Sequence, residues 1–581
     1  MTSPVFSETY LVLSRGKACV MCRQRKRRCD AVKPICGTCK KAGLSYYCIY
    51  GSQDPEVLRI QEESLQERVA ELETLIKGLE TRAEPERSPQ VPVSRSTRRL
   101  SSRKSSGAHP RYTVHVPSQD LEASSSTPIP LPIVDPYQAW WQFQDAAPAG
   151  IRDPLVEAFI RYRWQFAFEF NVPRFLASLD LPPSHPNAPH PCLLNAVMLS
   201  GCLYSSPNGP LRRYEPYFLK RMNQDMAQSL SSVDKLFDFL RASALAGCYF
   251  YGTSRLQEGY HYLSTAMRFA IGCGLNAIDT LSLDSQPPSQ LLPPCTDMVE
   301  LGDRINAFWG LYCVDSAGSL VIGAPAAASE REITTTWPCP WEYYQDGRAL
   351  QQTHGNLSAL YESSKAATWA RDDNVYALRA KSIALLARAS VLLARAKSNN
   401  PDLQTFRTDV IAICRASVNY AGSLPPYEDT SGGGDDPAAN RSIRAIAFCA
   451  AYSAVIQSYG IFGAFAMAGE QMKPEALATQ LRAANAAMVV VRDIMSLHYS
   501  YMPIYLGWAL TPVHEFFIRE RERLVERGNQ ESAEMVCANL SLLLQMFKRL
   551  DGVFPKARHV LDEILDHQIR SLVVRRASAP S

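Results

Sequence analysis

The chain has 581 residues, 46% of them apolar and 20% charged, which is too long for a single small domain and long enough for a large buried core with smaller modules attached. Its net charge is only +4, but ten Lys and Arg residues and one acid, Asp30, lie between Arg15 and Tyr50, so this segment carries +9 and the rest of the chain −5. This distribution excludes an evenly basic surface and indicates a polyanionic partner at one end only.

Two further features concern the compartment. Residues 1–14 lack the charged n-region and the long apolar stretch of a secretory signal, so we expect a reducing compartment in which the sixteen cysteines act as thiols and metal ligands. The uncharged segment Ala445–Gly469 is long enough to cross a bilayer, but it is rich in Ala and Gly and is interrupted by Gln457 and Gly460. It is predicted to be a buried helix pair broken near Gly460, and no membrane is expected as a partner.

Six cysteines follow the spacing C-x2-C-x6-C-x6-C-x2-C-x8-C, in which the unit C-x2-C-x6/8-C occurs twice. They are Cys19, Cys22, Cys29, Cys36, Cys39 and Cys48. Six thiolates can give two zinc ions four ligands each only if two of them bridge, and symmetry selects Cys19 and Cys36, the first cysteine of each half. The two predicted ligand sets are Cys19, Cys22, Cys29 and Cys36 for one zinc ion, and Cys36, Cys39, Cys48 and Cys19 for the other. Metal binding and folding of this segment should be one event.

Three alternatives fit the spacing less well. A redox Cys-x-x-Cys couple requires neither the repeat nor the remaining cysteines, and no βαβ pattern surrounds it. Two mononuclear zinc fingers would need eight ligands, and the segment contains no histidine. A disulfide knot would need secretion. The spacing therefore favours a binuclear zinc cluster.

The basic residues around the cysteines are candidate DNA contacts. They are Lys17, Arg23, Arg25, Lys26, Arg27, Arg28, Lys40 and Lys41. Lys and Arg can donate to O6 and N7 of guanine in the major groove, while flanking cations hold phosphates. For each cation taken alone, a solvated face or a nuclear import signal is the alternative.

The cysteine spacing, the loop "CRQRKRRC" and Pro34 resemble the fungal zinc binuclear cluster (Zn2Cys6) transcription factors over about Gly16–Tyr50. The resemblance implies that the basic loop forms a short helix whose end enters the major groove. It also implies that Lys26, with Arg25 beside it, reads bases of a CGG-type half-site. Arg25 and Arg28 stand where the family often has Lys, which keeps the charge and can shift the contacts.

A heptad repeat follows the cysteines, with leucines at one core position and Val or Ile at the other. The predicted dimerisation residues are Leu58, Leu65, Val69, Leu72, Ile76 and Leu79. Leucine at d with Val or Ile at a favours a parallel two-stranded coil, which predicts a homodimer whose linker Ile49–Glu56 sets the spacing of the half-sites. Glu62 and Gly78 weaken the repeat, and the alternative is an amphipathic helix that packs on the rest of the chain.

The remaining chain divides into a polar linker and a helical body. The linker, rich in Ser, Pro, Thr and Arg, has no apolar periodicity and is predicted to be disordered. In the body, Asp153 is the expected N-cap of a helix with Pro154 at its first position, and residues 279–297 and 431–437 are expected loops. An apolar helical stripe is predicted at Val375, Leu378, Leu385, Leu386, Ala389, Leu392 and Leu393.

Three segments of the body, His190–Ser206, Ser254–Leu275 and Asp303–Ala327, resemble the fungal-specific transcription factor domain, also called the middle homology region, over about Asp153–Tyr344. The residues that fit its pattern are Arg304, Phe308, Trp309, Asp315, Gly323 and Pro325. Ser316 departs from the pattern, since the family often has Arg there. The resemblance implies an all-helical regulatory domain that controls activity, in some members through a small metabolite.

No catalytic constellation is complete, so we expect no enzyme. The stretch from His514 to Ile518 lacks the second histidine of a zincin helix, and no Gly-Lys-Ser/Thr follows the glycines 432–434. Seven further cysteines lie in apolar runs and are predicted to be buried thiols rather than nucleophiles. They are Cys192, Cys202, Cys248, Cys273, Cys313, Cys414 and Cys449.

Taken together, the patterns predict a mainly α protein with four parts: a binuclear zinc cluster module (16–50), a short parallel coiled coil (56–83), a disordered linker (84–135) and a large all-α regulatory domain (136–574). The predicted function is a zinc-dependent, nuclear, sequence-specific regulator of RNA polymerase II genes that binds double-stranded DNA as a homodimer. The alternative is a regulatory interaction protein whose helical domain binds a small-molecule effector or a coregulator, with DNA binding secondary or supplied by a heterodimer partner.

Overall fold

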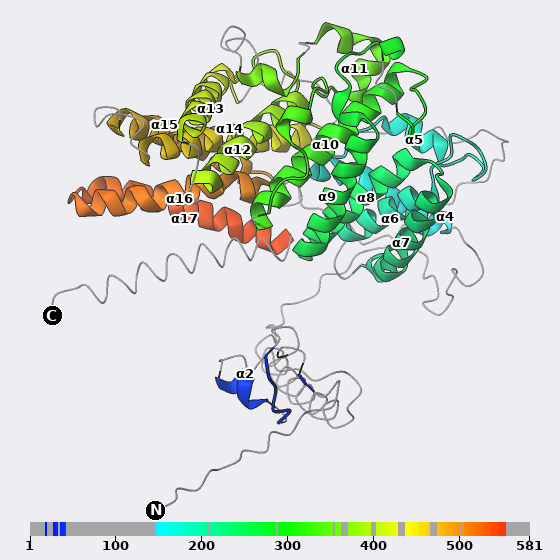
Figure 1. Ribbon diagram of the computed structural model, residues 1–581, viewed down its shortest axis with the longest axis horizontal. Coiled ribbons are helices and arrows are strands. Elements are labelled where there is room, and N and C mark those ends of the chain that lie inside the picture. Colours follow the sequence, from blue (N-terminus) through cyan, green and yellow to red (C-terminus); the bar gives the residue numbers. More distant parts are fainter. Residues whose placement is uncertain are drawn as a thin grey trace, which may run out of the picture. The chain divides into compact units, whose positions relative to one another are not determined.

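The computed structural model separates the chain into two units, residues 1–128 with the cysteine cluster and residues 129–581 with the helical body (Figure 1). The structure describes residues 18, 19, 22, 27–32, 35–41 and 147–553, with gaps at 206–208, 286–288, 323, 353–354, 362–369, 397–402, 428–435, 465–472, 499–501 and 503–504. Helices and short 3-10 turns form the secondary structure of these residues, and no strand occurs among them. The prediction of a mainly α protein is therefore confirmed.

The first half of the body packs its helices around α6 and α8, and α9 leads from them to the central helix α10. Its helices are α4 (Ala149–Tyr162), α5 (Val172–Ser178), α6 (Pro191–Tyr204), α7 (Glu215–Ser232), α8 (Leu236–Gly252) and α9 (Leu256–Gly272). Helix α6 contacts α4, α7 and α8, and α9 contacts both α8 and α10. Local signals start these helices: the side chain of His190 accepts the N–H of Cys192, and Asn171 accepts the N–H of Arg174.

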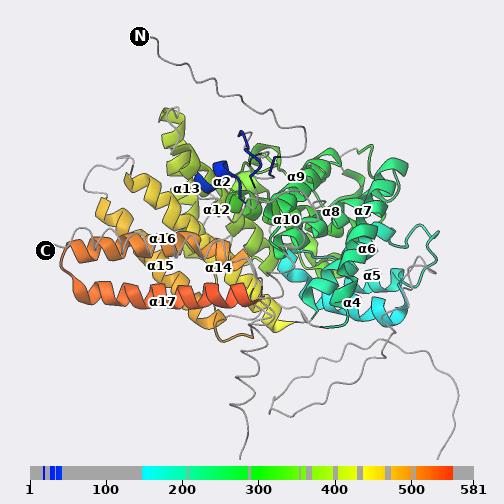
Figure 2. The ribbon, with the colours of Figure 1, turned by 90° about the horizontal axis from the view of Figure 1, so that it is seen from below.

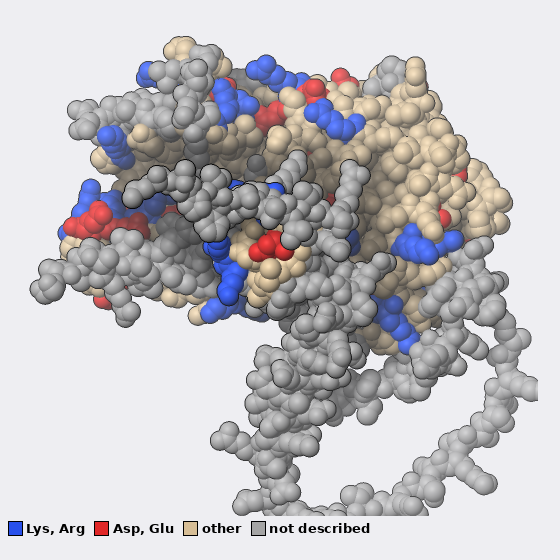
Figure 3. All heavy atoms as spheres, turned by 60° about the horizontal axis from the view of Figure 1, so that its bottom comes forward, with Lys and Arg blue, Asp and Glu red and all other residues tan. Residues whose placement is uncertain are grey.

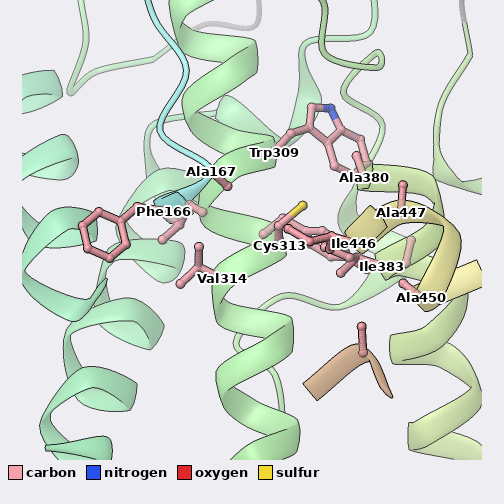
Figure 4. Close-up of a cluster of buried hydrophobic side chains, with 14 of the residues drawn as sticks. Phe166, Ala167, Trp309, Cys313, Val314, Ala380, Ile383, Ile446, Ala447 and Ala450 are labelled. Atoms are coloured by element: carbon pink, nitrogen blue, oxygen red, sulfur yellow. The ribbon is translucent and has the colours of Figure 1, made fainter. Parts of the chain in front are cut away.

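Helix α10 (Met298–Ile322) lies between the two halves of the body (Figure 1). The carboxylate of Asp297 accepts the N–H of Glu300, and the Glu300 side chain accepts the N–H of Thr296, so reciprocal bonds begin the helix. Figure 4 shows Val314 directed toward Phe166 of the first half, whereas Cys313 faces the side chains of α12 and α14. Helix α10 is thus the core element that both halves share.

The second half is built around α14. The helices that follow α10 are α11 (Trp341–Asp346), α12 (Val375–Ala396), α13 (Leu403–Ser423), α14 (Pro437–Ala464), α15 (Lys473–Ile494), α16 (Tyr505–Glu526) and α17 (Gln530–Val553). Helix α14 contacts α12, α13, α15 and α16. Helices α16 and α17 form an antiparallel pair, visible in Figure 2, that reverses at Gly528, whose φ is +72°.

Two sequence predictions about helix boundaries are wrong. Helix α4 begins at Ala149, so Asp153 lies inside it and Pro148 precedes it. The amides of Ile151 and Arg152 already donate to the Pro148 carbonyl, so the helix is established before Pro154, which has no N–H to donate to the Gly150 carbonyl.

Helix α14 is the second correction, because it continues through Gly460 instead of breaking there. A Cβ at Gly460 would lie 2.9 Å from Nε2 of Gln480, which donates to the Ile456 carbonyl, so the glycine admits a close neighbour rather than a bend. Among the described residues, α14 is the helix with the length and hydropathy of a membrane span, but 72% of its apolar window is buried inside the body. It packs as a core helix, as the sequence predicted for this segment.

Other predictions for the body are confirmed. The predicted stripe of α12 is buried at Val375, Leu378, Leu385, Leu386, Ala389 and Leu392, and Leu393 packs against the core. The helix also buries Arg379 and Lys381, which the apolar stripe did not indicate. The described part of residues 279–297 is a loop with one 3-10 turn, anchored by the buried side chains of Leu292 and Cys295.

Candidate zinc centre and nucleic-acid interface

The two halves of the cysteine cluster share one local geometry. The amide of Cys22 donates to Sγ of Cys19 at 3.3 Å, and the amide of Cys39 donates to Sγ of Cys36 at the same distance. Cys36 and Cys39 flank the start of α2 (Gly37–Lys41), so the Cys-x2-Cys spacing turns both sulfurs to one side. The repeat that is visible in the cysteine spacing is therefore also present in the backbone.

Four sulfurs, those of Cys19, Cys22, Cys36 and Cys39, lie within 4.8 Å of one another. The Sγ–Sγ distances are 3.8 Å for Cys19–Cys36, Cys19–Cys39 and Cys22–Cys39, and 3.6 Å for Cys22–Cys36. A tetrahedral zinc ion with Zn–S bonds of about 2.3 Å separates its sulfurs by roughly 3.8 Å. The four separations between the two halves of the cluster therefore match those of a tetrahedral zinc site.

Cys29 and Cys36 form a second potential ligand group together with Asp30. Cys36 thus belongs to both groups, as expected for a bridging ligand. In the predicted symmetrical division, Cys22 and Cys39 belong to different zinc ions, whereas the structure places their sulfurs in one group. The division into two ligand sets stays a prediction.

The burial of the thiols also explains why a metal cation would stabilise the cluster. Burial and hydrogen bonds to neighbouring thiols raise the pKa of Cys22 well above its ordinary value. A zinc ion held by these sulfurs would bind the thiolate form and supply the opposing charge, which would hold the segment together.

The described cations lie on both halves of the cluster. Arg27, Arg28, Lys40 and Lys41 are exposed, while the cysteines beside them are buried. The amide of Arg27 donates to the Cys22 carbonyl and that of Lys40 to the Cys36 carbonyl, so each cation-bearing segment is tied to a cysteine of its own half. Exposed positive charge therefore surrounds a group of buried sulfurs that could bind a metal ion.

Several predicted features lie outside the described residues. They are the ligand Cys48, the cations Lys17, Arg23, Arg25 and Lys26, the dimerisation residues between Leu58 and Leu79, the linker 84–135, Gly323 and the glycines 432–434. Their roles stay predictions.

The residues that resemble the fungal regulatory domain hold the body together. Arg304 is buried and donates to the Pro293 carbonyl and to Glu300. Trp309 stacks on Trp337 and donates to the Thr336 carbonyl at 2.7 Å. Phe308 is buried, and Asp315 accepts the Ala327 amide at 2.9 Å, which fixes the chain beyond Pro325. Each of these residues has a packing role within the fold.

The seven body cysteines that were predicted to be buried thiols are buried. Burial raises the pKa of Cys273 and Cys313 to about 11 and that of Cys202, Cys248 and Cys414 to about 12, and it raises the pKa of Cys192 and Cys449 further. At neutral pH these groups are protonated and therefore poor nucleophiles. His514 is also buried, within α16.

The charged surface of the body differs from that of the cluster. Figure 3 shows one face on which the described basic side chains are spread among neutral and acidic ones. Many body cations are paired, including Arg388 with Glu330 and Asp409, and Arg441 with Asp493. This distribution agrees with the +9 and −5 division of charge in the sequence.

Arg28, Asp30, Gly37 and Thr38 make contacts that the sequence analysis missed. The Asp30 carboxylate accepts the Gly37 amide, and the Thr38 hydroxyl donates to the Arg28 carbonyl at 2.8 Å. Their only sequence signal was proximity to Cys29 and Cys36, which does not reveal partners seven to ten residues apart.

These features define a protein with a small cysteine-based metal module and a large helical domain. Comparison with protein families matches residues 17–56 to the fungal Zn(2)-Cys(6) binuclear cluster domain and residues 159–353 to the fungal specific transcription factor domain. The chain therefore carries the two domains that its sequence resembles. Both families are those of transcription factors, and the cysteine cluster is consistent with the binding of two zinc ions.

One curated relative is the "Depudecin biosynthesis cluster-specific transcription activator DEP6" of Fusarium langsethiae, 26% identical over 354 residues. The similarity covers 52% of this chain and 56% of that protein, so the chain spans little more than half the length of the relative. No solved structure matches the chain.

Proposed function

We propose that the chain is a nuclear transcription regulator that binds duplex DNA through its zinc cluster. The observation that carries the proposal is the four-sulfur group surrounded by the exposed cations Arg27, Arg28, Lys40 and Lys41. The zinc-held backbone presents these charges to phosphates, and Lys26 with Arg25 reads base edges in the major groove. Each bidentate contact to guanine contributes roughly 1–3 kcal/mol of discrimination.

The chain acts as a homodimer in this proposal. A single half-site offers few contacts, and the heptad residues Leu58–Leu79 join two clusters at a spacing set by the linker Ile49–Glu56. The relative's name describes an activator, which supports activation as the direction of control. Size-exclusion chromatography with light scattering on the full chain should give the mass of a dimer, and the substitution Leu72→Asp should give that of a monomer.

The helical body is the regulatory part, and it controls the DNA-binding module through an effector or a coregulator. Between residues 166–169 and helices α8, α9 and α10, the structure contains a cavity of about 20 Å³. That volume holds about one water molecule, so a metabolite would have to open this cavity before binding there. We therefore assign no effector to this cavity.

Fluorescence anisotropy with the zinc-loaded full chain tests DNA binding directly. The probes are duplexes with two CGG triplets in each orientation and at a range of spacings, together with a scrambled duplex. Lys26→Ala should weaken binding to the preferred duplex by roughly 10-fold or more because it removes a base contact, while Arg161→Ala, an exposed body cation, should leave it unchanged. If Lys26→Ala binds the preferred duplex as tightly as the parent protein, Lys26 does not read bases and the proposed base contact is refuted.

Affinity should also depend steeply on salt, because each phosphate that a cation neutralises releases counterions. A plot of log Kd against log salt whose slope is near zero would contradict the proposed interface.

A further inference from the structure

Two contacts join the end of the basic segment to helix α2. The Thr38 Oγ1 hydroxyl donates to the Arg28 carbonyl at 2.8 Å, and the Gly37 amide donates to both carboxylate oxygens of Asp30 at 2.9 and 3.0 Å. We name these four residues the interhalf clasp, because Arg28 and Asp30 flank the last cysteine of the first half while Gly37 and Thr38 follow the first cysteine of the second half.

The backbone around the clasp is shaped for these contacts. Ala31 has a φ of +55°, a left-handed conformation that turns the chain directly after Asp30, and its amide donates to Sγ of Cys29 at 3.4 Å. At Gly37 an added Cβ would lie 2.4 Å from Oδ2 of Asp30, so a side chain at this position would displace the carboxylate. The approach of the two segments therefore depends on a turn at one side and on a glycine at the other.

The clasp connects cations that come from different halves. Arg27 and Arg28 extend from the first half and Lys40 and Lys41 from α2 in the second, and all four are exposed. Zinc would fix the sulfurs, whereas two other bonds hold the segments together: the Thr38 hydroxyl donates to the Arg28 carbonyl, and the Gly37 amide at the start of α2 donates to the Asp30 carboxylate.

We propose that Thr38 is a positioning residue for DNA recognition. Its hydrogen bond holds the basic segment and α2 in one fixed arrangement, so that cations from both halves form a single DNA-contacting surface. This inference rests on the proposed function, since it requires that the cluster binds duplex DNA.

The substitution Thr38→Val removes the hydroxyl and keeps the shape of the side chain. A neutral hydrogen bond of this kind changes an equilibrium about two- to ten-fold, and we expect affinity for the preferred duplex to fall by that factor. Affinity for the scrambled duplex and the salt slope should stay unchanged, because no cation is lost. Zinc content should remain two ions per chain, because no ligand is altered.

Three variants serve as controls in the same anisotropy assay. Thr38→Ser keeps the hydroxyl and should restore the affinity of the parent protein. Gly37→Ala disrupts the other contact of the clasp, between the Gly37 amide and the Asp30 carboxylate. It should reproduce the selective loss of affinity for the preferred duplex that is expected for Thr38→Val. Lys40→Ala removes a cation instead, so it should weaken binding to both duplexes and lower the salt slope by about 1.

The possible results distinguish a failure of the positioning role of Thr38 from a failure of the proposed DNA binding. If the parent protein binds no duplex, the proposed function fails and the role of Thr38 falls with it. If the parent protein binds and Thr38→Val binds equally well, the proposed function stands and the positioning role is refuted. Loss of zinc in Thr38→Val would also overturn it, because the hydroxyl would then support metal binding rather than the orientation of the basic segment.

Discussion

The ion pair between Lys381 and Asp373 allows a quantitative test of how the body is held together. Both side chains are almost fully buried, at 2% and 4% exposure, and the Lys381 Nζ lies 2.6 and 2.7 Å from the two carboxylate oxygens. The ammonium also lies 5.2 Å from the centre of the Trp337 ring. Burial raises the pKa of Asp373 to about 6, so the pair is fully charged only above that pH.

Removing one partner leaves a buried group that must either stay charged or change its protonation. In Lys381→Met the Asp373 carboxyl can take up a proton. Relative to the same carboxyl in the unfolded chain, this protonation costs at most about 3.5 kcal/mol at pH 6.5 and at most about 6 kcal/mol at pH 8.5. In Asp373→Asn the Lys381 ammonium loses the carboxylate that offsets its burial. Removing one partner of a buried ion pair typically costs about 3–5 kcal/mol of stability. This cost is comparable to that of changing the protonation of the remaining group.

The two single variants should differ in their dependence on pH. The carboxyl left in Lys381→Met has a folded pKa above its unfolded value, so its contribution to stability is lost as pH rises, and this variant should weaken between pH 6.5 and 8.5. Asp373→Asn removes this carboxyl, so it should not weaken in this way over the same interval. The double variant K381M/D373N should not show the trend either.

Urea unfolding of the full chain, followed by helical circular dichroism, measures these differences without screening the charges. The double variant should lose much less stability than the two single losses combined, because no charge remains unpaired. As a control, Glu157→Gln breaks the exposed pair with Arg161 and should change stability by less than about 1 kcal/mol. Additive losses, or single variants that share one pH trend, would refute the reasoning.

Three further predictions concern other parts of the chain. Gly318→Ala would place a Cβ 1.9 Å from the Tyr251 hydroxyl and should lower the free energy of unfolding, measured in urea, by about 1–3 kcal/mol. As a control, the Cβ of Gly150→Ala would meet no atom within 4 Å, so this variant should not be destabilised. Equal effects of the two substitutions would contradict the packing around Gly318. Burial raises the pKa of Asp315 to about 6, so the wild type should lose about 2 kcal/mol relative to Asp315→Asn as pH rises from 4 to 7, and a difference that does not change with pH would show that Asp315 is not buried in this way. Chelation of zinc should abolish DNA binding in the anisotropy assay and leave the helical circular dichroism of the body nearly unchanged, and a large loss of helix would show that the body also requires the metal.

The sequence predicted the helices of the body well where apolar residues repeat with helical spacing, as in α12, because burial of one face is a local property of the pattern. It failed at α4, where Asp153 and Pro154 have the residue types of a helix start but the chain was already helical from Ala149. It also failed at Gly460, because a glycine that admits Gln480 cannot be distinguished by sequence from one that breaks a helix. At α4 the contacts that start the helix are local, with the Pro148 carbonyl, whereas at Gly460 the deciding neighbour is Gln480 of α15.

For the cysteine cluster the sequence predicted the metal-binding residues from their spacing, since the ligand geometry of zinc restricts that spacing strongly. It did not predict the contacts of Thr38 and Asp30, because a hydroxyl or a carboxylate can find a partner almost anywhere in a short folded module. Ligand identity is therefore accessible from sequence, while the orientation of the basic segment requires the structure.

The residues that carry the resemblance of the body to a regulatory domain argue for a fold and not for a ligand. Trp309 donates to the Thr336 carbonyl, Arg304 to the Pro293 carbonyl, and Asp315 accepts the Ala327 amide, so each motif residue ties α10 to the chain around it. A chain could keep all these contacts and respond to any effector or to none. In the proposed function, the specificity of regulation therefore lies in residues that this pattern does not constrain, and the choice of DNA lies in the short basic module.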